Sequence, residues 1–214
     1  MYLGGLISKS HDHRQEVTRR ISACFGTFRK LGMFWKRSNC PKKFKIQVYD
    51  AVVRSKLLYG LESVYLTTQV KNKLDVFQLK GFRKILGMQT TFMDRSNTNA
   101  RVFQKATEAI NTSSEHSRQV KPFSIYLQQK QQSLLKHTLR ATDDDPLRQC
   151  TFQCGSSVTL EHRNRRVGRP RGKWAVDVSE DIFVAHGFGN KSSFRNNVPA
   201  ACRQMEPSIR NRII

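Results

Sequence analysis

Apolar residues recur at helical spacing through the first 92 residues, most densely between Phe44 and Leu57. Positions three and four apart share one face of an α-helix, and here two faces are apolar. One face carries Phe44, Val48, Ala51, Val52 and Ser55, and the other carries Ile46, Tyr49, Val53 and Leu57. A surface helix needs one apolar stripe, so the pattern predicts a helix buried between neighbours, with Leu58 and Tyr59 in the packing.

A one-sided helix is predicted on each side of this central helix. The first is expected from Asp12, a suitable N-cap, to about Met33, and the other from Thr68 to Leu86, where Gly87 ends it. The apolar stripe of the first is Val17, Ile21, Phe25, Phe28 and Leu31, with Arg19, Arg20, Arg29 and Lys30 toward the opposite side. The stripe of the other is Val70, Leu74, Phe77, Gly81 and Ile85. We therefore expect residues 12–92 to form one helical unit.

The remaining sequence is less regular. Residues 2–7 predict a short strand, and residues 93–123, rich in Asn, Ser and Thr, predict a linker with one short helix. Helical spacing returns within residues 124–186, and the polar residues 187–214 predict a disordered tail. The predicted fold class is mainly α: a short strand, a small helical bundle, and a helical, partly disordered C-terminal region.

The charge of the chain indicates a polyanionic partner. The chain holds 38 Lys and Arg against 16 Asp and Glu, a net charge of +22, and residues 1–92 hold 18 against 5. Nucleic acid is the predicted partner, because neutralising phosphates releases counterions. A membrane partner is not expected, since no basic amphipathic helix stands out and no apolar stretch is long enough to span a bilayer. The candidate contacts on the predicted helices are Arg19, Arg20, Lys30, Arg54, Lys56, Arg83 and Lys84. Any single lysine more often belongs to a solvated surface, and it is the set as a whole that favours nucleic acid.

The densest basic run follows Arg165 and Arg166 and contains the motif Gly168-Arg169-Pro170-Arg171. Glycine lets the backbone approach DNA closely and proline keeps it extended, so Arg169 and Arg171 can lie in a narrow A·T minor groove. This is the core of an AT-hook, and Lys173 adds to it. The alternative is a solvated basic loop before a helix that packs through Trp174.

The sequence predicts no metal site and no catalytic set. Cys150, Cys154 and His162 suggest a zinc knuckle, but their spacing fits no common pattern and a fourth ligand would have to come from far away. The three consecutive aspartates at 143–145 precede a proline and are more typical of a turn or helix cap. The five cysteines are scattered, which favours reduced thiols in the cytoplasm or nucleus.

The order of several motifs resembles the region after the catalytic palm of non-LTR (LINE-type) retrotransposon reverse transcriptases. The likeness covers about residues 1–183, with Lys136 where that family usually has glycine. The matching segments are Tyr2-Leu3-Gly4, Leu57-Leu58-Tyr59-Gly60-Leu61-Glu62, Phe82-Arg83-Lys84-Ile85-Leu86-Gly87, Leu135-Lys136-His137-Thr138-Leu139-Arg140 with Asp143-Asp144, and Arg165 to Trp174.

The resemblance implies a role for each segment. Residues 1–11, with Tyr2, Leu3 and Gly4, would be the end of the palm and its primer grip. Residues 12–92 would be the thumb, which holds an RNA–DNA hybrid or duplex DNA through its backbone and shallow groove. The remainder would help to bind target DNA or template RNA.

The family's catalytic motif, an aromatic residue followed by x-Asp-Asp, does not occur in this sequence. We therefore expect a fragment of a polymerase that is inactive alone, partnered by upstream domains, with Mg²⁺ bound only in the missing palm. The alternative is a transposon-derived interaction protein that binds DNA through the AT-hook-like run or associates with RNA.

Overall fold

The protein is mainly helical in the part that a computed structural model describes, which is residues 13–64, 66–111, 118–160 and 174–210. Within these ranges there is no β-strand, and the only β-type pairing is a bridge between Phe152 and Thr159. The prediction of a mainly α fold is confirmed. The strand predicted at residues 2–7 and the cap at Asp12 lie outside the described residues.

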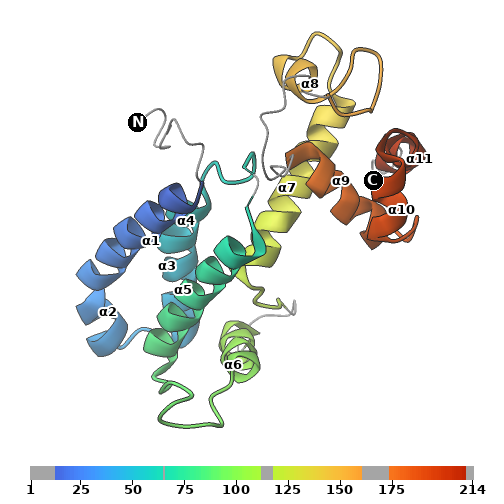
Figure 1. The fold of residues 1–214 in the computed structure, drawn as a ribbon. Helices are drawn as coiled ribbons and strands as arrows, with labels where there is room; N and C mark the ends of the chain where they lie inside the picture. Colours follow the sequence, from blue (N-terminus) through green and yellow to red (C-terminus); the bar gives the residue numbers. More distant parts are fainter. Residues whose placement is uncertain (1–12, 65, 112–117, 161–173, 211–214) are drawn as a thin grey trace. The chain divides into compact units, whose positions relative to one another are not determined.

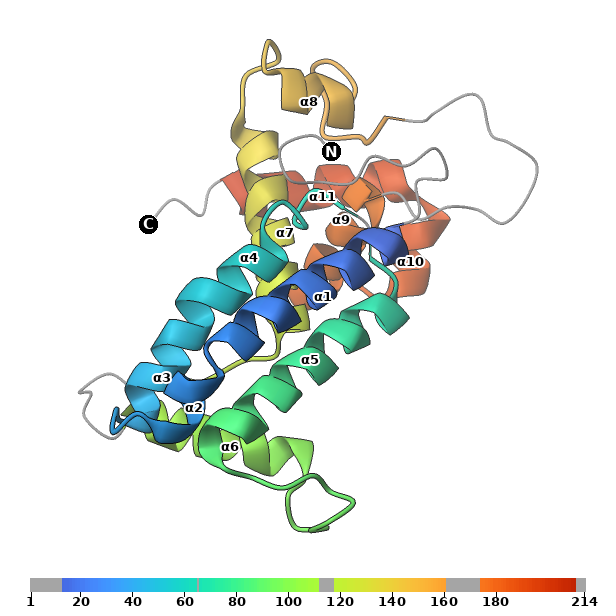
Figure 2. The same cartoon turned by 90° about the vertical axis from the view of Figure 1, so that its left-hand side faces the viewer.

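The chain divides into two compact units, and the first contains the described residues up to Leu61 together with Leu66–Leu127. In this unit α1, the segment from α3 to α4, and α5 lie side by side, and α6 packs against α3 and α5 (Figures 1 and 2). Its helices are α1 (His13–Lys30), α2 (Gly32–Arg37), α3 (Lys42–Tyr49), the π-helical turn η1 (Asp50–Arg54), α4 (Ser55–Leu58), α5 (Thr68–Leu86) and α6 (Asn99–Asn111).

The central helix is continuous from α3 through η1 to α4, because the residues at both junctions keep helical backbone angles. Only one of its two apolar faces is buried: Ile46, Tyr49, Val53 and Leu57 are fully enclosed. The prediction of burial on both sides is wrong, since Phe44 is 48% exposed and Val52 is 38% exposed. Leu58 is buried as expected, but Tyr59 lies at the surface.

The buried face of α1 differs from the predicted stripe by a rotation about the helix axis. Val17, Cys24 and Phe28 are buried, whereas Phe25 is 51% exposed. The helix also ends earlier than predicted, at Lys30, and a separate short helix, α2, carries the buried Trp35. The indole Nε1 of Trp35 donates to the backbone oxygen of Phe28 at 2.9 Å, so α2 folds back onto the end of α1.

Helix α5 follows the prediction closely. All five residues of its predicted stripe are buried: Val70, Leu74, Phe77, Gly81 and Ile85. Gly87 ends the helix with φ +72°, a left-handed conformation that glycine adopts without steric cost. The Gly87 and Met88 backbone N–H groups both donate to the Arg83 carbonyl, which satisfies an otherwise unpaired helix end.

The first unit extends beyond the predicted boundary at residue 92. Val102 and Ala106 of α6 are fully buried, so the segment predicted as a linker contributes to the core. Gln78 of α5 binds the backbone of the segment that follows α6. Its Nε2 donates to the Lys121 carbonyl at 3.0 Å, and its Oε1 accepts from Phe123 N–H at 2.8 Å. The polar composition of this segment did not indicate that it packs on the core, because only two residues of α6 are buried.

The second unit contains Glu62–Tyr65 and the chain from Gln128 onward. Its core is apolar and is made of Leu135, Leu139, Phe152, Val178, Ile182, Phe183, Phe194, Ala201, Cys202 and Met205. Its helices are α7 (Phe123–Arg140, from Gln128), α8 (Pro146–Thr151), α9 (Trp174–Ala185), α10 (Lys191–Asn196) and α11 (Val198–Arg210).

The disordered tail predicted after residue 187 is wrong for residues 191–210, which form α10 and α11. Phe194 and Met205 insert into the core of the second unit. Glu180, itself buried, accepts from Arg195 at 2.7 Å and lies 3.6 Å from Lys191, which fixes α10 against α9. A few buried apolar residues and this ion pair are enough to order a polar segment.

Asp145 confirms the predicted helix cap. It is the N-cap of α8, where its carboxylate accepts from the backbone N–H groups of Leu147 and Arg148. The neighbouring Asp143 accepts from Nε of the buried Arg148 at 2.8 Å. Arg148 also donates to the Leu139 carbonyl at 3.0 Å, so it satisfies the C-terminal end of α7.

Candidate nucleic-acid interface

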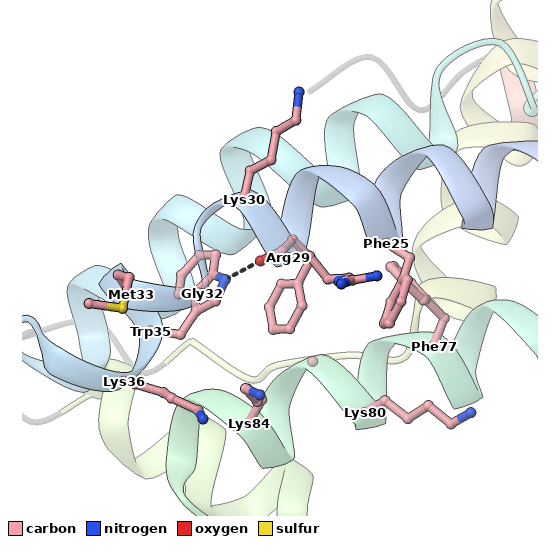
Figure 3. Close-up of a pocket in the computed structure, with 12 residues that line it drawn as sticks. Phe25, Arg29, Lys30, Gly32, Met33, Trp35, Lys36, Phe77, Lys80 and Lys84 are labelled. Carbon is pink, nitrogen blue, oxygen red and sulfur yellow. Dashed lines mark hydrogen bonds between the residues drawn. The ribbon is translucent and has the colours of Figure 1, made fainter.

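A groove of about 580 Å³ lies within the first unit, between α1, α2 and α5 (Figure 3). Each helix supplies both apolar and cationic side chains. The lining residues are Phe25, Phe28, Arg29 and Lys30 of α1, Gly32, Met33, Trp35 and Lys36 of α2, and Phe77, Lys80, Gly81 and Lys84 of α5.

None of the lining residues is acidic, and five of them are cationic: Arg29, Lys30, Lys36, Lys80 and Lys84. All five are exposed, and none has an ion pair with an acid in the described part of the chain. Like charges held on one surface repel each other unless anions neutralise them. The groove is therefore an anion-attracting surface.

The floor of the groove is aromatic and ordered. Phe28 and Trp35 stack with their ring centroids 5.1 Å apart. The hydrogen bond from Trp35 to the Phe28 carbonyl, the dashed line at Trp35 in Figure 3, fixes the pair. Behind them Tyr49 packs edge-on against Phe28 at 5.8 Å. Phe25 and Met33 stand at the mouth, 51% and 61% exposed, and the guanidinium of Arg29 lies 6.0 Å from the Phe25 ring. The groove thus combines cations with accessible apolar surface.

The structure places Lys30 and Lys84 in this groove, but it removes Arg20 from the surface. Arg20 is buried, pairs with Glu16, and donates to the Tyr59 carbonyl, so the prediction that it faces outward is wrong. Hydrogen bonds and charge from Arg19 and, to a smaller extent, Arg20 outweigh burial and together lower the pKa of the Glu16 carboxyl from 4.5 to about 2. Arg20 is a structural group that joins α1 to the end of α4.

The other predicted contacts on these helices already have protein partners and do not line the groove. Arg19 is 2.8 Å from Glu16, and Arg54 is 3.6 Å from Asp50. Arg83 donates to the Asn97 carbonyl at 3.2 Å and holds the loop before α6. Lys56 is exposed and donates to the Thr27 hydroxyl at 3.1 Å.

Several predicted site residues lie outside the described residues. They are the primer-grip-like residues Tyr2, Leu3 and Gly4, and the basic residues Arg165, Arg166, Arg169, Arg171 and Lys173. Their roles remain predictions from the sequence.

Arg29, Lys36 and Lys80 are groove residues that were not among the predicted contacts. A signal existed for Lys80, because it precedes Lys84 by four positions and so shares its helix face. No comparable signal existed for Lys36, since its place depends on how α2 folds back against α1 and α5.

The thiols give no sign of chemistry in the described residues. Cys24 and Cys202 are buried, and burial raises the pKa of Cys202 to about 11, which keeps it protonated. Cys150 and Cys154 are exposed, and the described ranges hold no group of three metal-ligating side chains. His162, the third residue of the proposed zinc knuckle, lies outside those ranges.

Among the helices that the structure describes, none has the length and apolarity to cross a membrane. Comparisons with protein-family models, with characterised proteins and with solved structures give no match for this chain. The function of the chain is therefore inferred from the groove and from the motifs of the sequence.

Proposed function

We propose that this chain is the C-terminal part of a non-LTR retrotransposon reverse transcriptase, and that its first unit binds nucleic acid through the groove between α1, α2 and α5. The ordered motifs of the sequence support the family assignment. The observation that carries the binding proposal is the groove itself, which gathers five cations and no acid. A phosphate backbone suits such a surface, because lysines and arginines that neutralise phosphates release counterions and so give affinity.

In this proposal the first unit has the holding role of a polymerase thumb. Backbone contacts by flexible lysines bind a hybrid or a duplex without selecting its sequence. The two-metal chemistry of polymerisation would belong to palm carboxylates in upstream domains, and Mg²⁺ would be bound there. This chain would supply affinity and position to the nucleic acid.

The test is a titration of the full chain with an RNA–DNA hybrid at several salt concentrations. The logarithm of the binding constant should fall linearly with the logarithm of the salt concentration. The double substitution Lys80→Gln with Lys84→Gln should weaken binding and reduce the slope by about 0.9 for each phosphate that the protein no longer neutralises. Both lysines are exposed, so the fold should tolerate the change.

A matched control is available within the first unit. Lys73 of α5 and Lys105 of α6 are also exposed, and neither lines the groove. Substituting both with Gln removes the same net charge and should change affinity and slope less. The proposal fails if the hybrid does not bind at low salt, or if the groove pair and the control pair have the same effect.

A further inference from the structure

The apolar surface of the groove is not explained by phosphate binding. Lysines that bind only a phosphate backbone need no exposed aromatic ring beside them, yet Phe25 is 51% exposed and Met33 is 61% exposed at the mouth. Figure 3 shows the two side chains at opposite ends of the groove, Phe25 beside the Arg29 guanidinium and Met33 on α2 near Lys36. The ligand that uses the whole groove therefore has an apolar part close to its negative charge.

The groove is shaped before any ligand binds. Phe28 and Trp35 are almost fully buried and are held in a stack, so they cannot collapse into the opening. Phe77 of α5 closes the floor from the other side and is also buried. A preformed apolar surface costs little conformational entropy when a flat ligand covers it.

We propose that the groove accepts unpaired nucleotides of a single-stranded nucleic acid, with a base against Phe25 and the adjoining phosphates on Lys80 and Lys84; this rests on the proposed function. A nucleotide combines a flat apolar ring with a phosphate on one short unit. In a duplex the base faces are stacked inside the helix and cannot reach an aromatic side chain. Unpaired bases stack on aromatic rings regardless of sequence.

The position of Arg29 adds to this assignment. Its guanidinium lies 6.0 Å from the centre of the Phe25 ring, so the two groups offer a base an aromatic face and a planar cation. Such pairs favour nucleobases, because guanidinium planes also stack on π-systems. A fatty-acid chain has no flat π-face to stack on these groups and gains mainly from the apolar surface, and an acidic peptide gains mainly from the charge.

The experiment uses the full chain and three ligands that have the same number of phosphates in each strand. They are a short single strand, the duplex of that strand, and a single strand of the same length without bases. We expect the single strand to bind more tightly than the abasic strand. Phe25→Ala should weaken the single strand by about 5- to 150-fold, the range found for loss of one aromatic stack, and leave the other two ligands unchanged. Lys80→Gln should weaken all three.

Phe92→Ala is the matched control, because Phe92 is 93% exposed and does not line the groove. Should Phe25→Ala perturb the circular dichroism spectrum, Phe25→Leu tests the same position, because it keeps the apolar volume and removes the aromatic face. Equal affinity for the abasic strand, or no effect of either Phe25 substitution on the single strand, overturns this inference while nucleic-acid binding stands. Loss of all binding at low salt instead overturns the proposed function.

Competition experiments distinguish a site for single-stranded nucleic acid from a site for another anion. Polyglutamate or oleate should displace the single strand only weakly. If either binds more tightly than the oligonucleotide, and Phe25→Ala weakens it as strongly, the groove is a site for that anion and the inference is overturned.

Discussion

Substituting Gly81 with Ala should destabilise the first unit, because α5 approaches Tyr49 too closely there for a side chain. A Cβ at Gly81 would lie 2.6 Å from Tyr49 Cε2 and 2.7 Å from Cζ, well inside van der Waals contact. The ring cannot easily retreat, since Tyr49 is fully buried and packs on Phe82 at 5.4 Å and on Phe123 at 6.2 Å. Overpacking of this kind costs about 1–3 kcal/mol.

The same substitution at Gly26 provides the control. Gly26 lies inside α1, is exposed, and would place its Cβ with nothing within 4 Å. Alanine there should stabilise by about 1 kcal/mol through helix propensity alone. The propensity gain is common to both sites, so Gly81→Ala should be less stable than Gly26→Ala by about 1–3 kcal/mol, which isolates the steric cost.

Urea unfolding of the first unit measures this difference. Trp35 packs on Phe28 beside Tyr49 and reports on that unit, and Trp174→Phe removes the other tryptophan of the chain. The midpoint of the Trp35 fluorescence transition should move up for Gly26→Ala and should be lower for Gly81→Ala than for Gly26→Ala, with the same m-value. If the two variants are equally stable, Tyr49 does not lie against α5 as the structure has it.

Three further substitutions test buried polar groups. Arg148→Ala should lower the stability of the second unit by about 1–3 kcal/mol in thermal unfolding, because it removes the donor to the Leu139 carbonyl; an unchanged midpoint would contradict this. Tyr49→Phe should raise the stability of the first unit by about 1 kcal/mol, because the buried hydroxyl has no hydrogen-bond partner among the described residues; a loss would show that it has one. The pKa of Glu16 is about 2 in the folded protein against an ordinary value of 4.5, so its contribution to folding stability is present above pH 4.5 and is lost as the pH falls toward 2. Glu16→Gln should therefore make stability less dependent on pH across that window, and an unchanged acid transition would refute the assignment.

Local signals in the sequence predicted the helices where one face was clear. The stripe of α5 and its glycine end, and the Asp145 cap before Pro146, depend on neighbours within a few residues, so both are confirmed. For the groove, the sequence indicated basic helices and named Lys30 and Lys84. It did not show which cations converge, because α1, α2 and α5 are brought together only by folding.

The sequence by itself determined that this protein is helical and strongly basic, since both follow from spacing and composition. Only the tertiary structure decided which face of α1 and of the central helix is buried, whereas the buried face of α5 followed from its stripe. In α1 two overlapping stripes were available, and the one chosen buries Arg20 and exposes Phe25, because Glu16 and the Tyr59 carbonyl satisfy the guanidinium. That choice leaves an aromatic ring among lysines, and so creates the groove.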